Sequence, residues 1–233
     1  MVDISFSQIS QPQIRDSDTN EGMLSFDIET LGLNEKRDLI TVISLYDPSK
    51  NIERVLRFVD ITVEEGCVRY KPDYRHMVEE LVEILDKADH LCGFNAVSFD
   101  IPFIACQFKI PAKTANEWKE KTFDILKISR CHFNRTFSLN LLFSMNNVSS
   151  CGKTSDGLHA IKMAETGQWK KLEDYCLEDS RIIHEISSLK TIYCPEGGNW
   201  RRRNSGQTHD PSHVAQINTS LFPKLSFSFG AKK

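Results

Sequence analysis

Two carboxylates stand two residues apart in an apolar stretch that begins at residue 23. Apolar and polar side chains alternate there, which predicts a β-strand over residues 23–31. Such a strand places Phe26 and Ile28 on one face and Asp27 and Glu29 on the other. At a rise of about 3.3 Å per residue the two carboxylates lie roughly 7 Å apart, and they repel each other unless a cation lies between them. A solvated edge strand with an acidic outer face would also explain the pair.

A third carboxylate interrupts the apolar stripe of a late helix. Residues from about 168 to 189 repeat apolar side chains at steps of three and four, as an amphipathic helix does. The stripe contains Leu172, Tyr175, Cys176, Asp179, Ile182, Ile183 and Ile186. A lone carboxylate buried in its middle would cost several kcal/mol without a partner. Tyr175 lies one turn before Asp179 on the same face. A narrower stripe, with Asp179 at the water's edge, is the alternative.

A fourth acid, Asp100, lies where a short apolar strand passes into a helix. The strand is expected at residues 90–94, and Pro102 fits the opening turn of the helix that follows. The free amides and the dipole of a helix N-terminus stabilise an aspartate in this position. Asp100 is therefore either a helix-terminal residue or a member of a site, and this segment alone leaves both interpretations open.

The order of elements around these acids predicts an α/β fold. Antiparallel strands come first, with a turn at 47–51, and later strands alternate with helices. Strands or extended segments are expected at residues 23–31, 39–46, 52–59, 90–94 and 122–129. Helices are expected from Pro72 to about Ala88, from about Asp100, and in two or three pieces over 136–190, one of them bounded by Asp156 and Gly167. The predicted sheet is mixed, antiparallel in its opening strands and then parallel, with helices on its faces.

The predicted domain covers residues 22–190, between two segments of different composition. Residues 1–21 are polar and acidic, which predicts an extension that packs little. Residues 191–233 are basic and predict a loop and tail, with Arg201–Arg203 beside Trp200. Such a run either binds and stacks on a single-stranded nucleic acid or forms a solvated charged surface.

Composition excludes several classes of protein. The chain has 233 residues, 40% of them hydrophobic and 26% charged, as globular proteins do and disordered chains do not. No apolar run reaches the roughly 18–20 residues of a membrane span, and no signal or transit pattern opens the chain. We expect an intracellular protein, cytoplasmic or nuclear, that has no membrane partner. Seven cysteines without a C-x-x-C pair predict reduced thiols. Cys131, His132, His209 and His213 have no partners at metal-ligand spacing.

Taken together, the acidic motifs resemble the DEDDy family of 3′–5′ exonucleases, which have a ribonuclease-H-like fold. The resemblance spans about residues 22–190 and rests on three segments in the family's order. These are Asp27-Ile28-Glu29-Thr30, Asn95-Ala96-Val97-Ser98-Phe99-Asp100 and Tyr175-Cys176-Leu177-Glu178-Asp179. The chain is most similar to the proofreading exonuclease domain of family-B DNA polymerases and its stand-alone relatives. The DEDDh branch places a histidine five residues before the last aspartate, where this chain has Asp174, so Tyr175 indicates the DEDDy branch.

The resemblance implies two divalent ions, Mg²⁺ or Mn²⁺, held by Asp27, Glu29, Asp100 and Asp179. Oxygen-only ligands suit these hard cations. It also implies that Tyr175 orients or helps to deprotonate the attacking water, and that a nucleoside 5′-monophosphate leaves a single-stranded 3′ end. Thr30, Leu31, Asn95 and Phe99 match positions that contact the terminal nucleotides, although Phe99 could equally be core.

Other interpretations of the same sequence stay open. A catalytically idle nucleic-acid-binding or polymerase-associated module could share the fold, although the complete set of acids argues against it. A ribonuclease H or resolvase type of endonuclease is disfavoured by the late Tyr-x-x-x-Asp. Lys153 could contact a phosphate or be solvated, and Asp124 could be an extra acid or a helix cap. The family-B resemblance favours DNA over RNA, and a replication, repair or RNA-processing partner would bind through the termini.

Overall fold

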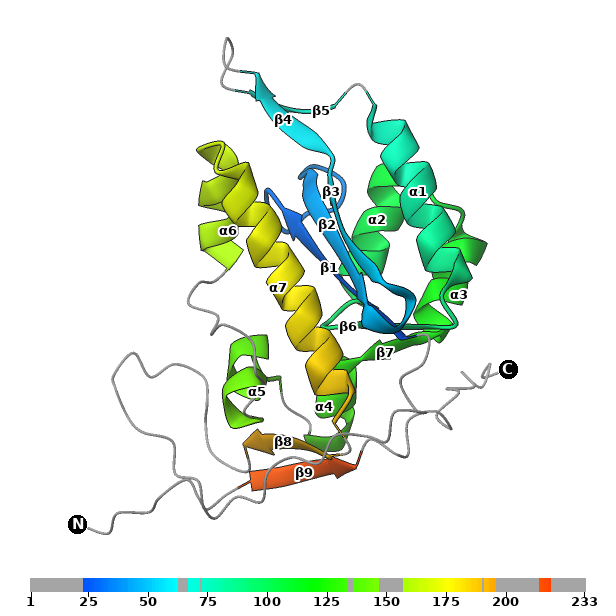
Figure 1. Cartoon of the computed structure of the whole chain (residues 1–233), viewed down its shortest axis with the longest axis vertical. Helices are drawn as coiled ribbons and strands as arrows, with labels where there is room; N and C mark the ends of the chain where they lie inside the picture. Colours follow the sequence, from blue (N-terminus) through cyan, green and yellow to red (C-terminus); the bar gives the residue numbers. More distant parts are fainter. Residues whose placement is uncertain are drawn as a thin grey trace, which may run out of the picture.

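A five-stranded mixed sheet forms the centre of the computed structural model (Figure 1). The structure describes residues 23–62, 67–71, 73–133, 136–146, 157–189, 191–195 and 214–218. The strand order is β3-β2-β1-β6-β7. The strands are β1 (Met23–Thr30), β2 (Ile40–Asp47), β3 (Ile52–Arg57), β6 (His90–Gly93) and β7 (Thr122–Asp124). β1, β2 and β3 pair antiparallel, whereas β6 runs parallel to β1 and β7 parallel to β6. The predicted mixed sheet is confirmed.

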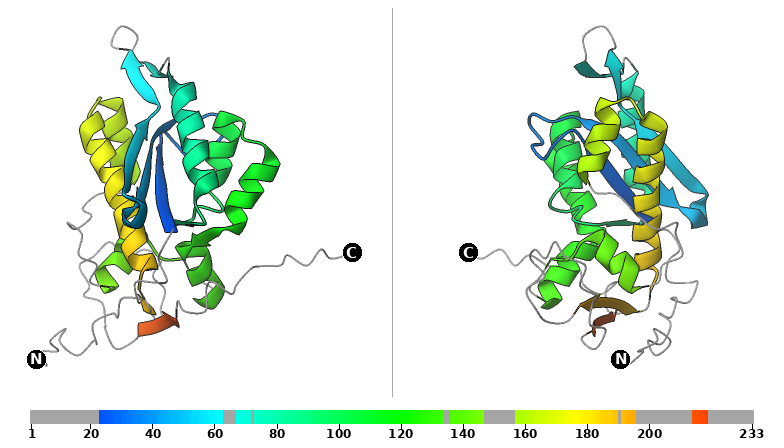
Figure 2. Two further views of the ribbon diagram at one scale, coloured as in Figure 1. Left: turned by 45° about the vertical axis from the view of Figure 1, so that its right-hand side comes forward. Right: turned by 90° about the vertical axis from the view of Figure 1, so that its left-hand side faces the viewer.

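Helices cover both faces of this sheet and make three layers (Figures 1 and 2). One face is covered by α1 (Tyr74–Lys87), α2 (Asp100–Phe108) and α3 (Ala112–Glu120). The other is covered by α6 (Gly157–Glu165) and α7 (Trp169–Ser187). α4 (Ile125–Phe133) and α5 (Leu139–Met145) lie near the C-terminal end of α7. In the described part of the chain, no helix has the length and apolarity needed to cross a membrane.

The alternation in β1 divides its side chains between the two layers, as predicted. Leu24, Phe26 and Ile28 are buried in the main core with residues of α1, α2 and α3. The intervening side chains therefore face α6 and α7, where a smaller apolar cluster fills the space. That cluster consists of Val42, Ala160, Met163, Ala164, Leu172 and Cys176. One face of β1 thus stabilises the fold, and the other is available for polar groups.

Two of the predicted elements differ from the structure. The segment expected to be extended over 122–129 is a strand only to Asp124, and α4 begins at Ile125. The Asp124 carboxylate accepts the amide of Lys127 at 3.0 Å, a helix cap that starts the helix. The third strand, expected over 52–59, ends at Arg57. Residues after Phe58 turn into a separate ribbon made of β4 (Val59–Thr62) and β5 (Cys67–Tyr70).

Residues 191–195 and 214–218 form strands, where the sequence predicted a loop and tail. These strands are β8 (Thr191–Pro195) and β9 (Val214–Asn218), which pair antiparallel. The buried Asn146 side chain at the end of α5 accepts the amide of Tyr193 at 2.8 Å and donates to its carbonyl at 3.0 Å. The Asn146 side chain thus pairs with both backbone groups of Tyr193, as a residue of a neighbouring strand does, and holds β8 against the domain. Residues 1–21, Lys153, Asp156, Trp200, Arg201–Arg203, His209 and His213 lie outside the described residues.

Candidate active site

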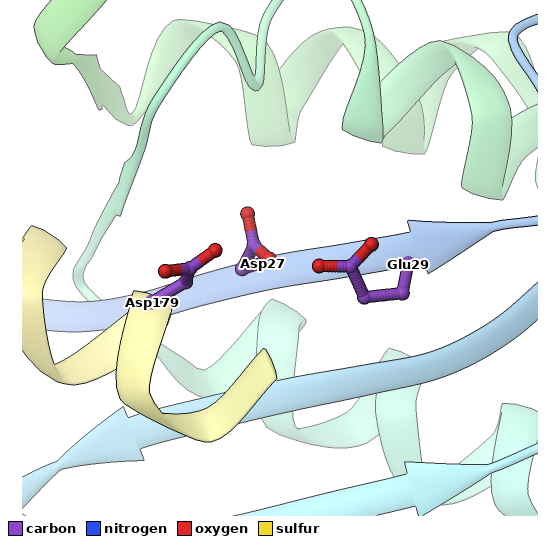
Figure 3. Close-up of side chains that lie close together, drawn as sticks. All are labelled: Asp27, Glu29 and Asp179. Atoms are coloured by element: carbon purple, nitrogen blue, oxygen red, sulfur yellow. The ribbon is translucent and has the colours of Figure 1, made fainter. Parts of the chain in front are cut away.

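Three carboxylates from β1 and α7 meet on the face of the sheet that α7 covers (Figure 3). One oxygen each from Asp27, Glu29 and Asp179 lies within 4.8 Å of the others. Asp27 and Glu29 are half-buried on adjacent outward positions of β1, and Asp179 is only 4% exposed in the middle of α7. The predicted pairing of a strand motif with a late-helix aspartate is therefore present in the geometry.

Like charges this close favour a bound cation. At an effective dielectric constant near 20, two ionised carboxylates about 5 Å apart repel by roughly 3 kcal/mol. A divalent cation among the three oxygens replaces this repulsion with attraction. Carboxylate oxygens alone, without sulfur or imidazole, are the ligands that Mg²⁺, Mn²⁺ and Ca²⁺ prefer. The three side chains therefore fit a hard divalent ion in charge, donor type and spacing.

A thiol lies directly behind these acids. Cys176, one turn before Ser180 on α7, is fully buried, and its Sγ lies 3.5 Å from the Asp27 carbonyl oxygen and 3.8 Å from Oδ2. Burial raises the pKa of this thiol well above its usual range, and the nearby charges of Asp27 and Glu29 raise it further. The thiol therefore stays protonated and can donate toward Asp27.

Asp100, the first residue of α2, is 3% exposed and is hydrogen-bonded by the backbone of Ile28, which lies between Asp27 and Glu29 on β1. It is not among the three acids whose oxygens converge within 4.8 Å. Burial raises its pKa to about 8, and the negative charge of Asp124 adds to the rise, while backbone hydrogen bonds from its own residue and from Ile28 oppose it. Without a cation, Asp100 is thus mainly protonated at neutral pH.

The loop that leads to Asp100 is shaped by Asp124 on the neighbouring strand β7. Its carboxylate accepts the amides of Asn95 and Val97, each at 3.0 Å, besides that of Lys127. Asn95 has a left-handed backbone with φ 67°, and its carbonyl accepts the amides of Ser98 and Phe99. The sequence left Asp124 as either an extra acid of the site or a helix cap, and these bonds support the helix cap.

The remaining predicted residues differ in how they face the acids. Tyr175 is half-buried one turn before Asp179 and packs on the small apolar cluster beside α6. Phe99 packs on the main core and on Phe103, with ring centroids 5.3 Å apart. Thr30 is buried, and its hydroxyl donates to the Gly32 carbonyl at 2.5 Å. The packing of Phe99 agrees with the core role that its sequence position left open.

The loop after β1 exposes a residue that the sequence analysis missed. Leu31 packs on the small apolar cluster, whereas Leu33 is 83% exposed. The loop is held firmly: a Cβ on Gly32 would lie 2.2 Å from the Asp38 carboxylate, and Gln107 of α2 donates to the Glu35 carbonyl at 2.8 Å. The sequence shows two leucines in Leu31-Gly32-Leu33, but it does not show which of them is buried and which is exposed.

The layered mixed sheet with acids on β1 and α7 defines a nuclease-type, ribonuclease-H-like protein. The family profile of the RNase H superfamily matches residues 24–189, and the chain belongs to that superfamily. Its structure is similar to that of the family B DNA polymerase from the hyperthermophilic archaeon Pyrobaculum calidifontis. The TM-score is 0.52 at 15% identity, over 76% of this chain and 26% of the polymerase.

A second similar structure is titled the apo form of a nuclease. It gives a TM-score of 0.42 at 21% identity, over 71% of this chain and 69% of that chain. No curated protein sequence matches this chain. The chain spans only about a quarter of the polymerase, so the likeness concerns the fold of one part of that enzyme.

Proposed function

We propose that this protein is a metal-dependent 3′–5′ exonuclease that releases nucleoside 5′-monophosphates from single-stranded ends. The observation that carries the proposal is the convergence of Asp27, Glu29 and Asp179 within 4.8 Å, with Tyr175 one turn before Asp179. Membership of the RNase H superfamily supports a nuclease, and the three motifs support the DEDDy branch.

The acids have the role of cation ligands in this proposal. Asp27, Glu29 and Asp179 would hold a Mg²⁺ or Mn²⁺ ion, and Asp100 would complete a two-ion set. Two such ions, when bound, stabilise the attacking and the leaving oxygens of an in-line displacement at phosphorus. Because Asp100 is mainly protonated near neutral pH without a cation, its participation requires loss of that proton. Cation affinity should therefore rise with pH.

Tyr175 would orient the attacking water rather than act as a free base. A phenol hydroxyl both donates and accepts hydrogen bonds, which suits it to positioning a water molecule. The Tyr175 ring is fixed by packing on the small apolar cluster, and its backbone by the same helix that positions Asp179. A water bonded to this hydroxyl would thus be held beside the acids.

The substrate end would lie along the loop after β1 and the loop before α2. Leu33 offers an exposed apolar side chain for a base, and Asn95 in its left-handed turn offers a polar one. Thr30 would hold the first loop through its hydrogen bond to Gly32, and Leu31 and Phe99 would anchor the two loops by packing on the apolar clusters. We propose DNA rather than RNA as the substrate, because the motifs most resemble those of family-B polymerases.

Digestion of end-labelled single strands tests this function. DNA and RNA of equal sequence, labelled at the 5′ end, are incubated with the protein and Mg²⁺, Mn²⁺ or EDTA. The expected result is a ladder shortened from the 3′ end with mononucleotide product, lost in EDTA and in Asp27→Asn. Asp174→Asn, an exposed acid on α7 paired with Lys170 at 2.6 Å, is the matched control and should stay active. Binding without metal-dependent cleavage would instead indicate an idle nucleic-acid-binding module.

A further inference from the structure

A cluster of three small polar side chains joins α7 to β2 behind the carboxylates. Ser44, Cys176 and Ser180 are each fully buried. The Ser44 hydroxyl donates to the Cys176 carbonyl at 2.7 Å, and the two serine hydroxyls lie 2.6 Å apart. The Cys176 Sγ lies 3.2 Å from the Ser44 Oγ. Either hydroxyl can be the donor between the two serines, and the Ser180 hydroxyl also lies 3.4 Å from the Ser44 carbonyl oxygen.

The cluster lies at the level where the acids meet. Ser44 is the register partner of Asp27 across the β1–β2 pair. Ser180 follows Asp179 directly, and Cys176 precedes Asp179 by three residues, with its Sγ 3.5 Å from the Asp27 carbonyl oxygen. The same few groups therefore contact the strand pair that carries Asp27 and the helical turn that carries Asp179.

The size of these side chains sets how closely the helix approaches the sheet. A side-chain hydroxyl of β2 reaches a main-chain carbonyl of α7 at 2.7 Å, which requires the helix backbone to lie close to the strand. Interiors are close-packed, so one or two added methyl groups here would displace the helix or strain it. Apolar packing alone is non-directional, whereas these hydrogen bonds also fix the position of the helix along the strand.

We infer that Ser44, Cys176 and Ser180 are positioning residues that set the distance of Asp179 from Asp27 and Glu29 and thereby the affinity of the site for a divalent cation. This inference rests on the proposed metal-dependent function. The cluster contacts neither substrate nor cation, and it acts through the separation of the three carboxylates.

A purely structural cluster would also be buried and hydrogen-bonded, so the test compares cation affinity with stability. Ser187 provides the matched control, because it is fully buried on the same helix and its hydroxyl donates to the His184 carbonyl of α7 at 2.7 Å. It lies eight residues beyond Asp179, about 12 Å along the helix at about 1.5 Å per residue. A substitution at Ser187 lowers stability without moving the turn that carries Asp179.

The experiment measures Mn²⁺ binding by calorimetry and urea unfolding in EDTA, on the full chain and its variants. Ser44→Ala should weaken Mn²⁺ binding by about fivefold, the scale of one lost hydrogen bond. Cys176→Leu, which adds bulk, should weaken it by tenfold or more, and Cys176→Ser, which keeps a small donor, should keep it within about twofold. Ser187→Ala and Ser187→Val should lose stability but keep native Mn²⁺ affinity. Should Cys176→Leu not fold, Ser44→Ala decides.

Asp179→Asn separates failure of this inference from failure of the proposed function. If Asp179→Asn binds Mn²⁺ as the native chain does, the metal site itself is misassigned. If Asp179→Asn loses binding while Ser44→Ala and Cys176→Leu retain it, the function stands and the positioning role is overturned. An equal loss of affinity in the Ser187 variants would also overturn it, because the effect would then follow stability and not position.

Discussion

Replacing Asp179 by asparagine should change stability in opposite directions with and without a cation. Asp179→Asn keeps the shape of the side chain and removes its charge from a group of three carboxylates whose oxygens lie within 4.8 Å. Two of the three repelling pairs disappear. Each is worth roughly 3 kcal/mol at full ionisation and an effective dielectric constant near 20. Because Asp27 and Glu29 are half-exposed and screened by solvent, and a proton can relieve the repulsion, the expected gain is about 1–2 kcal/mol.

In the presence of a cation, the native chain should be more stable than Asp179→Asn. A ligand at 100 times its dissociation constant stabilises the native chain by about 2.7 kcal/mol, whereas a variant that has lost the site gains little. The assay is urea unfolding at pH 7.5, in EDTA and in saturating Mn²⁺, for the native chain, Asp179→Asn and the control Asp174→Asn. The control should follow the native chain in both conditions, because its partner is the exposed Lys170.

The stability of Asp179→Asn relative to the native chain in EDTA tests whether the three carboxylates repel one another. A lower stability of Asp179→Asn in EDTA would show that the carboxylate is a structural hydrogen-bonding group, and the electrostatic explanation of the cluster would be refuted. Equal Mn²⁺ stabilisation of both proteins would refute Asp179 as a ligand.

Three further predictions follow from the same geometry. Tyr175→Phe should lower turnover by about 10²-fold while calorimetric Mn²⁺ affinity stays native, since the phenol is not a ligand; a collapse of affinity would contradict this role. Through Asp100 alone, the native chain holds up to one more proton than the unfolded chain between the ordinary pKa of 3.8 and the raised pKa of about 8. Metal-free stability should therefore fall as pH rises from 5 to 8, by at most about 1.4 kcal/mol per pH unit, and this slope should vanish in Asp100→Asn. Asp124→Asn should cost about 2 kcal/mol in urea unfolding, because it weakens bonds to three amides; a native unfolding curve would show that these bonds are dispensable.

The parts of the fold that could be predicted are those whose pattern is local and long. The alternation through β1 gave both its faces, because every second side chain of a strand points the same way. The apolar stripe of α7 likewise placed Tyr175 and Asp179 on the helix face that is directed toward the sheet. The convergence of β1 and α7 at the acids followed only from the resemblance of the motifs, since spacing within each element says nothing about their mutual distance.

Other features depend partly or wholly on contacts between residues that are distant in the sequence. The start of α4 at Ile125 depends on Asp124, whose carboxylate binds the loop before Asp100 as well as the helix. The run from 122 to 129 is too short to separate a strand from a helix by period. Ser44 is an unremarkable polar residue in the sequence of β2, and only the structure shows its bond to α7.

The pairing of Asn146 with Tyr193 bears on where the folding unit ends. The superfamily match stops at residue 189, yet Ile192 and Cys194 are buried in the same apolar cluster as Ile182 and Ile186 of α7. A fragment cut at residue 190 would lose both bonds between the Asn146 amide and the β8 backbone, each worth about 1 kcal/mol, while the amide nitrogen would keep its bond to the Leu142 carbonyl at 2.7 Å. It would also open the base of the core beside α5 to water. The packed core of this fold therefore extends beyond its sequence match to include β8.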